Sequence, residues 1–185
     1  TGWPDEEIHL FAPGVDSGTY DYFTKAIVGT EHASRGDITS SEDDNVLVQG
    51  VAGDRLALGF FGFAYYSENA DSLTAVAVID GDETNGAGGI QPSVITVADG
   101  TYQPLSRPIF VYVSTDAAER EEVQGLINYY LTEGRELVNE VGYIAMPDRA
   151  YELALERFAA RTTGSVFGGD GSTVGASVID MLEGQ

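Results

Sequence analysis

Four consecutive residues, Asp16-Ser17-Gly18-Thr19, carry the groups best suited to holding an anion. The hydroxyls of Ser17 and Thr19 can donate hydrogen bonds, and Gly18 has no side chain to keep a ligand from the backbone. If a helix begins at Ser17, its first backbone N–H groups are unpaired and carry about half a positive charge. The sequence therefore predicts an oxyanion cradle at residues 16–19, with an ordinary serine N-cap as the alternative.

The residues on either side predict the elements that would present this cradle. Residues 6–12 have the pattern of a strand that leads into a turn at Pro13-Gly14. Residues 18–28 have the pattern of a helix that ends at Gly29. The apolar face of this helix is expected to consist of Tyr20, Phe23, Ile27 and Thr24.

Strand and helix patterns alternate along the rest of the chain, which predicts an α/β fold. Strands are expected at 55–60, 73–79 and 109–113, with a short extended piece at 141–144. Helices are expected at 42–51, 61–68, from 92–93 onward, at 116–140 with a break near Gly134, and at 148–161. Loops are expected at 30–40 and 80–91, and a loose tail near the end that finishes in an apolar piece at 178–182.

The charge of the chain excludes several classes of function. Its 185 residues include 30 Asp and Glu against 9 Lys and Arg, a formal net charge of −21. Such a chain has no basic face to displace counterions from nucleic acid, and its charge opposes binding to an anionic membrane. The acidic residues are scattered along the chain rather than gathered in long runs, and Lys25 is the only lysine. We therefore expect a surface adapted to molar salt, where the repulsion between the negative charges is screened.

Other constellations predict no enzyme, metal site or cofactor. The chain has no cysteine, which excludes thiolate chemistry. Ser17 lacks the surrounding glycines of a nucleophile elbow, so His9 and His32 are expected to be structural or exposed rather than catalytic. The acidic segments 80–86 and 42–44 are expected to be a solvated loop and a helix first turn, respectively, rather than cation sites.

Several segments, in their order and spacing, resemble the phosphate-binding proteins of ABC phosphate importers. They are PGVDSGTYDYFTKAIVG, SRGD, SEDDNVLVQGV, GDRLALGFFGFAYY, TYQPLSRPIFVYV and RTTGSVFGG. The resemblance implies a two-lobed, type II periplasmic-binding-protein fold that traps phosphate in a cleft. Residues 1–104 would be the second lobe and 105–185 the C-terminal part of the first lobe. The N-terminal part of the first lobe is not found in this sequence, so we expect weak or no phosphate binding by this chain alone.

The resemblance also implies which residues bind the ligand. Ser17, Gly18 and Thr19 match the motif that donates to phosphate oxygens. Many members have an arginine where Pro13 stands, so Arg35 is the expected substitute, with pairing to Asp37 as the alternative. Asp16 is expected to orient Arg35 or accept a ligand proton, or else to make a local turn contact.

The implied partners are inorganic phosphate and an ABC permease, at a periplasmic or cell-surface location and with no cofactor. Two other functions remain open: a phosphate-responsive sensor without transport, and a phosphate-ester hydrolase, which the missing nucleophile and metal cluster disfavour.

Overall fold

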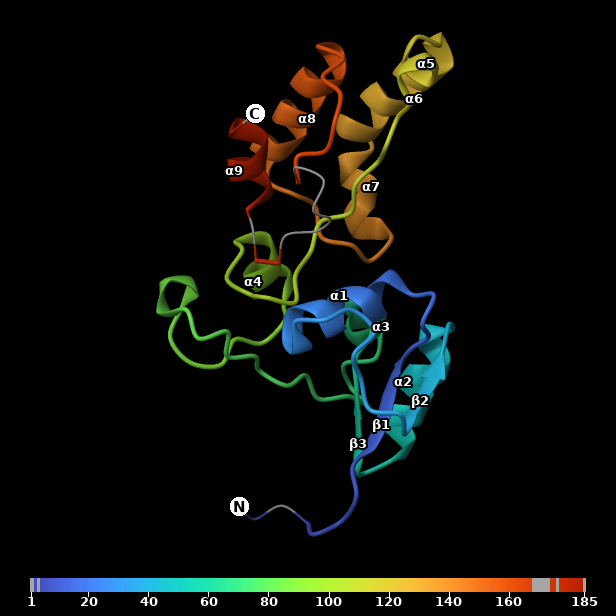
Figure 1. Ribbon diagram of the computed structural model, residues 1–185, viewed down its shortest axis with the longest axis vertical. Helices are drawn as coiled ribbons and strands as arrows, with labels where there is room; N and C mark the ends of the chain where they lie inside the picture. Colours follow the sequence, from blue (N-terminus) through green and yellow to red (C-terminus); the bar gives the residue numbers. More distant parts are fainter. Residues whose placement is uncertain (1, 3, 168–173, 176, 185) are drawn as a thin grey trace. The chain divides into compact units, whose positions relative to one another are not determined.

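The computed structural model describes residues 2, 4–167, 174–175 and 177–184 (Figure 1). The chain divides into two compact units, Thr1–Ala77 and Val78–Gln185. The lobe boundary expected near residue 104 stays a prediction, because a division into compact units does not test an assignment to lobes.

The first unit is built on a three-stranded parallel sheet. Its strands are β1 (His9–Pro13), β2 (Ile38–Ser41) and β3 (Ala57–Gly59), in the order β2-β1-β3. Leu10 pairs with Ile38 on one side of β1 and with Leu58 on the other. Three helices follow the strands in turn: α1 (Gly18–Val28), α2 (Asp44–Gly53) and α3 (Phe63–Glu68). In Figure 1 the strand arrows point toward α1, which lies at the carboxyl end of the sheet.

Close packing of α2 against the sheet forms the core of the first unit. Leu47 is completely buried, and Val48 and Ala12 are nearly so. A Cβ on Gly50 would overlap the ring of Phe11, so only glycine allows α2 to approach β1 this closely. A Cβ on Gly59 would lie 2.9 Å from the carbonyl oxygen of Phe11, so β3 also depends on glycine at that position.

Local signals define α1 at both ends, as expected. Ser17 is its N-cap, and Gly29 ends it with a left-handed φ of 81° that favours glycine. The buried side chains are Tyr20, Tyr22 and Thr24. The expected apolar face was therefore wrong at Ile27, which is 51% exposed. Thr24 is buried because its hydroxyl donates to the carbonyl of Tyr20 and accepts from the backbone N–H of His32.

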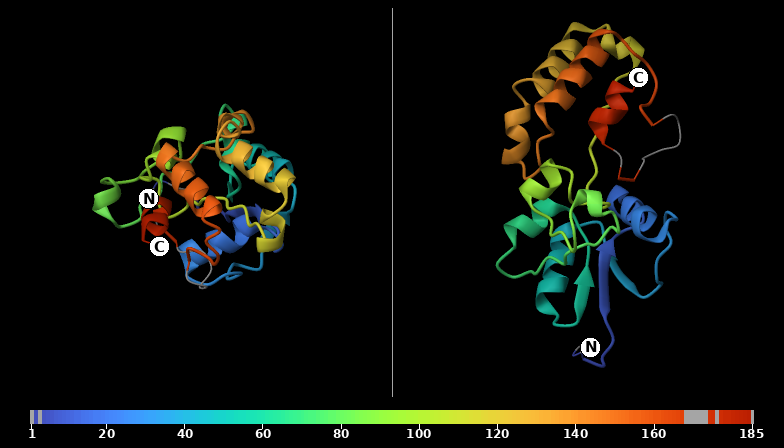
Figure 2. Two further views of the ribbon diagram at one scale, coloured as in Figure 1. Left: turned by 90° about the horizontal axis from the view of Figure 1, so that it is seen from above. Right: turned by 90° about the vertical axis from the view of Figure 1, so that its left-hand side faces the viewer.

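The second unit is helical in its described residues. Its helices are α4 (Val94–Ala98), α5 (Thr115–Ala118), α6 (Glu121–Leu131), α7 (Arg135–Glu140), α8 (Asp148–Ala159) and α9 (Val178–Glu183), with a 3-10 turn at Glu83–Asn85. Helix α8 packs against both α6 and α9, and Figure 2 shows α6 and α8 side by side. Arg149 joins α8 to α9 through an ion pair with Glu183 at 3.2 Å. The expected break near Gly134 is confirmed, between α6 and α7.

Several predicted elements differ from the structure, and the helical region expected at 116–140 is also interrupted between α5 and α6. The expected loop 30–40 contains most of β2. The apolar runs at 73–79 and 109–113 form no strand among the described residues, apart from one antiparallel bridge between Val78 and Ile90. Isoleucine and valine favour strands only where a neighbouring strand supplies hydrogen bonds and packing, and no described strand pairs with these runs. No helix among the described residues is long and apolar enough to span a membrane.

Candidate functional site

The predicted cradle lies at the carboxyl edge of the parallel sheet. The chain leaves β1 through a tight turn in which the backbone N–H of Ser17 donates to the carbonyl of Gly14 at 3.0 Å. From β1 the chain moves to β2 on one side and then crosses to β3 on the other. Open α/β sheets bind ligands at the carboxyl ends of strands, where the strand order reverses in this way. The turn that carries Ser17 is therefore where this fold is suited to hold a ligand.

The geometry at Ser17 combines a helix cap with free donors. Ser17 has extended backbone angles, and its Oγ accepts from the backbone N–H of Thr19 at 3.2 Å. Its hydroxyl hydrogen can still be donated to a ligand. Within the described part of the chain, the backbone N–H groups of Gly18 and Tyr20 have no acceptor, as expected for a helix first turn. Gly18 is exposed, whereas Tyr20 is buried, so the N–H of Gly18 is the one that an anion can reach from solvent. The serine cap and the anion cradle are thus compatible.

Asp16 lies in the turn directly before the cradle. It is exposed, and its carboxylate has no hydrogen-bond partner among the residues that the structure describes. Neither the expected contact with Arg35 nor the alternative local turn contact is present. Asp16 therefore places a solvated negative charge next to the anion donors.

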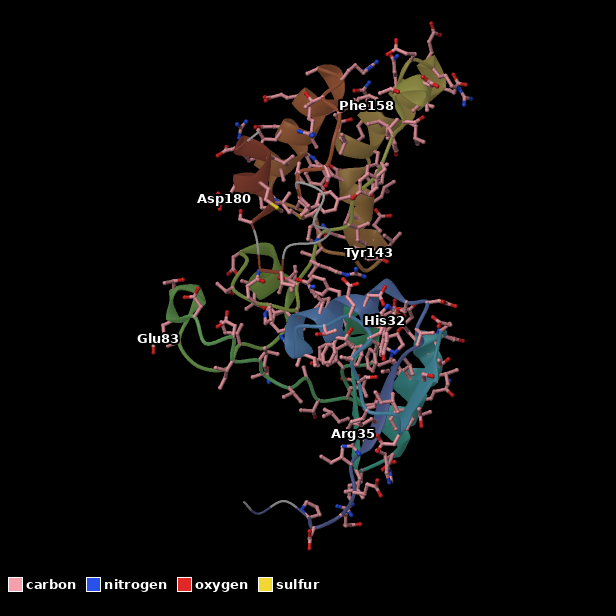
Figure 3. All side chains as sticks on the ribbon, viewed as in Figure 1. His32, Arg35, Glu83, Tyr143, Phe158 and Asp180 are labelled. Carbon is pink, nitrogen blue, oxygen red and sulfur yellow. The ribbon has the colours of Figure 1, made fainter. Side chains whose placement is uncertain are left out.

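Arg35 lies at the opposite, amino edge of the sheet. Its Nε donates to Oδ1 of Asp37 at 2.9 Å, and its Nη2 contacts Oδ2 of the same carboxylate. This hydrogen bonding lowers the pKa of Asp37. Figure 3 shows Arg35 toward the beginning of the strands, away from α1. The structure does not bring Arg35 to Ser17, because Arg35 precedes β2 whereas Ser17 follows β1, and the two strands are parallel.

The two histidines have partners other than Ser17. His9 Nδ1 lies 2.5 Å from Asp54 Oδ2 at the amino edge of the sheet. His32 Nε2 lies 3.3 Å from Asp21 Oδ1, and its ring packs edge-on to Tyr20 beside α1 (Figure 3). Neither imidazole is hydrogen bonded to the Ser17 hydroxyl, and both side chains are more than half exposed, within the expectation that they are structural or exposed.

The contact between His9 and Asp54 predicts a pH dependence. Hydrogen bonding to Asp54 raises the pKa of His9, and hydrogen bonding to His9 lowers the pKa of Asp54. Protonated His9 stabilises the fold through this contact, and its contribution is lost as pH rises through the folded pKa of His9. Ionised Asp54 also stabilises the fold, and its contribution is lost as pH falls through the folded pKa of Asp54. The pair therefore stabilises the fold most between these two pKa values.

We expect Asp54→Asn to lower the pKa of His9 toward its ordinary value, because the charged partner is removed. NMR titration of the His9 ring signals measures this pKa, with the His32 signals as an internal control that should not respond. An unchanged His9 titration curve would show that the contact has no electrostatic effect in solution.

The acidic segments have structural roles, as expected. Asp43 is the N-cap of α2 and accepts from the backbone N–H of Asn45. At the 3-10 turn Asp82 accepts from the Thr84 hydroxyl and also from the Thr84 backbone N–H, and these two hydrogen bonds lower the pKa of Asp82. No group of three or more potential metal-ligating side chains occurs among the described residues.

Two features beside the cradle were missed by sequence reasoning. The rings of Phe23 in α1 and Phe60 after β3 stack with centroids 3.8 Å apart, which fixes the helix against the neighbouring strand end. The carboxylate of Glu42 covers Gly14, where a Cβ would overlap it. The aromatic run at 60–66 signals the first contact, but no local pattern predicts the second, because it depends on the pairing of β1 with β2.

Comparison with known proteins places the chain in a family. A model of the PBP superfamily domain matches residues 1–133. The chain belongs to the PBP superfamily. This confirms the α/β, periplasmic-binding-protein-like fold that the sequence predicts, and the division into one complete lobe and part of the other stays a prediction.

Relatives of this PBP-superfamily chain are similar over most of its length. Protein SphX of Synechococcus elongatus is 47% identical over the whole chain, which covers 53% of that protein. The phosphate-binding protein PstS of Staphylococcus haemolyticus is 32% identical over 84% of the chain and 47% of its own length. A crystal structure of a possible phosphate binding protein from Planctomyces limnophilus has a TM-score of 0.68 and 41% identity, over 88% of this chain and 56% of that one. The chain spans about half the length of these relatives.

Proposed function

We propose that this chain binds inorganic phosphate at residues 17–19 and serves in the solute-binding component of an ABC phosphate importer. The observation that carries the proposal is the exposed first turn of α1 at the carboxyl edge of the sheet. Two hydroxyls and the unpaired N–H groups of Gly18 and Tyr20 are gathered there. These are donors for a tetrahedral oxyanion.

The names of the relatives support phosphate as the ligand. PstS is named a phosphate-binding protein and the Planctomyces limnophilus protein a possible one, and both are at least 32% identical to this chain. Names of this kind favour the binding role over the sensor alternative. The role is capture rather than chemistry, with a membrane permease as partner and a periplasmic or cell-surface location.

Titration of the chain with inorganic phosphate tests this function. The sequence left weak or no binding as the expectation for this chain alone, and the donors at residues 17–19 favour weak binding. Amide NMR shifts detect weak as well as tight binding and identify the site. We expect the largest shifts at Gly18, Thr19 and Tyr20, and smaller shifts with sodium chloride as the control. Phosphate shifts centred on Arg35, or none above those of the chloride control, would contradict the proposal.

We also infer that the acidic surface is an adaptation to high salt. The net charge of −21 opposes folding by self-repulsion in dilute buffer, and salt at about 1 M shortens the Debye length to about 3 Å. We expect the Tm to rise by about 10 °C between about 0.1 M and 2 M NaCl, equivalent to about 3 kcal/mol for a chain of this size. Screening predicts that most of the rise occurs below about 1 M. A Tm that is highest in dilute buffer would contradict the inference.

A further inference from the structure

Glu42 lies beside the predicted cradle and belongs to a different strand. It directly follows β2, and the backbone N–H of Gly14 donates to the carbonyl of Ser41 at 3.2 Å. This backbone contact holds the residue after β2 next to the turn after β1. The Glu42 side chain then covers Gly14, where a Cβ would lie 2.5 Å from the Glu42 Cδ. Gly14 in turn hydrogen bonds to Ser17, so one tight turn separates Glu42 from the cradle.

The charge of Glu42 is not neutralised by its surroundings. Among the described residues, no arginine, lysine or histidine forms an ion pair with Glu42. The charged groups nearest to it along the chain are Asp43 and Asp44 at the beginning of α2, and Asp16 lies in the turn that Glu42 covers. Burial, followed by the charges of Asp43 and Glu42, raises the pKa of Asp44. The charged side chains named at this end of the sheet are therefore all negative, and they oppose the positive first turns of α1 and α2.

We propose that Glu42 is a specificity-determining residue that disfavours more highly charged anions in the cradle. The proposal rests on the proposed phosphate binding. The repulsion between a fixed carboxylate and an anion scales with the anion's charge, whereas the hydrogen bonds of the cradle do not. We take the carboxylate and the anion to be on the order of 8 Å apart in a water-like medium. Removing the negative charge of Glu42 then lowers the Kd of a singly charged anion about 2-fold and that of a doubly charged anion about 6-fold. Glu42 thus shifts the cradle's preference toward the singly charged, doubly protonated form of phosphate.

Phosphate itself supplies the test, because its charge changes with pH. At about pH 6 it is mainly singly charged, and at about pH 8.5 it is mainly doubly charged. We expect Glu42→Gln to lower the Kd, followed at the Gly18 amide, about 2-fold at the lower pH and about 6-fold at the higher pH. Both gains should shrink in about 1 M NaCl, because the charges are then screened.

Two control variants separate charge from shape. Glu42→Asp keeps the carboxylate and should retain the wild-type ratio of the two Kd values. Glu31→Gln removes the same charge from the exposed loop after the far end of α1, about 16 Å from its first turn, and should change neither Kd.

Each outcome decides the proposal. Equal Kd changes at the two pH values, or none, in Glu42→Gln would overturn the role of Glu42 and leave phosphate binding intact. The absence of phosphate-induced shifts in the wild-type chain would overturn the proposed function, and the role of Glu42 with it.

Discussion

Replacement of Ser17 by aspartate is expected to abolish phosphate binding without unfolding α1. Aspartate is as good an N-cap as serine, so its carboxylate can accept from the backbone N–H of Thr19 as the Ser17 Oγ does. The same carboxylate occupies the helix first turn with a negative charge, at the place proposed for the anion. Two like charges about 4 Å apart near a protein surface repel by about 4 kcal/mol, so we expect phosphate affinity to fall at least about 100-fold.

Asparagine at position 17 is the matched control for this variant. It keeps a capping side chain of the same size and carries no charge, so we expect its affinity to stay within about 10-fold of the wild type. Ser17→Ala removes the cap and is expected to cost about 1 kcal/mol of stability. Phosphate titration and urea unfolding of the three variants separate the two effects. Wild-type affinity in Ser17→Asp would show that the anion binds elsewhere.

Truncation of Leu47 is expected to have the largest effect on stability. Leu47 lies in α2 with 0% of its surface exposed, against the sheet that positions the cradle. Leu47→Ala removes buried methyl groups and leaves a cavity that the neighbouring side chains fill only in part. We therefore expect the free energy of unfolding to fall by about 2–5 kcal/mol. Urea unfolding followed by circular dichroism measures this change.

Val46→Ala is the control for the loss of packing. Val46 is the neighbouring residue on the same helix and is 50% exposed, so its truncation is expected to change stability by less than about 1 kcal/mol. Equal losses in the two variants would mean that α2 does not pack on the sheet through Leu47.

The features that could be predicted from sequence are those defined by neighbouring residues. Helix α1 begins at Ser17 and ends at Gly29 because a side-chain cap and a left-handed glycine act within one turn of the helix. The unpaired N–H groups of the first turn follow from the same cap, and anion binding by them stays a prediction. The pairing of Arg35 with Asp37, which the sequence left as an alternative, is likewise a contact between residues two positions apart.

The features that could not be predicted depend on pairing between distant segments. Strand β2 is only four residues long, half of them serine, and is a strand because it pairs with β1. The run at 109–113 has stronger strand propensity and forms none, because no described strand pairs with it. The distance between Arg35 and Ser17 and the contact of Glu42 with Gly14 both follow from the parallel register of β1 and β2. That register is a tertiary property, which one sequence does not reveal.

The most direct test of the account is a crystal structure of the chain grown with phosphate. We expect a tetrahedral anion within hydrogen-bond distance of the backbone N–H of Gly18, with the Ser17 and Thr19 hydroxyls turned toward it. An anion bound instead at the amino edge of the sheet, beside Arg35, would contradict the assignment of the site to the first turn of α1.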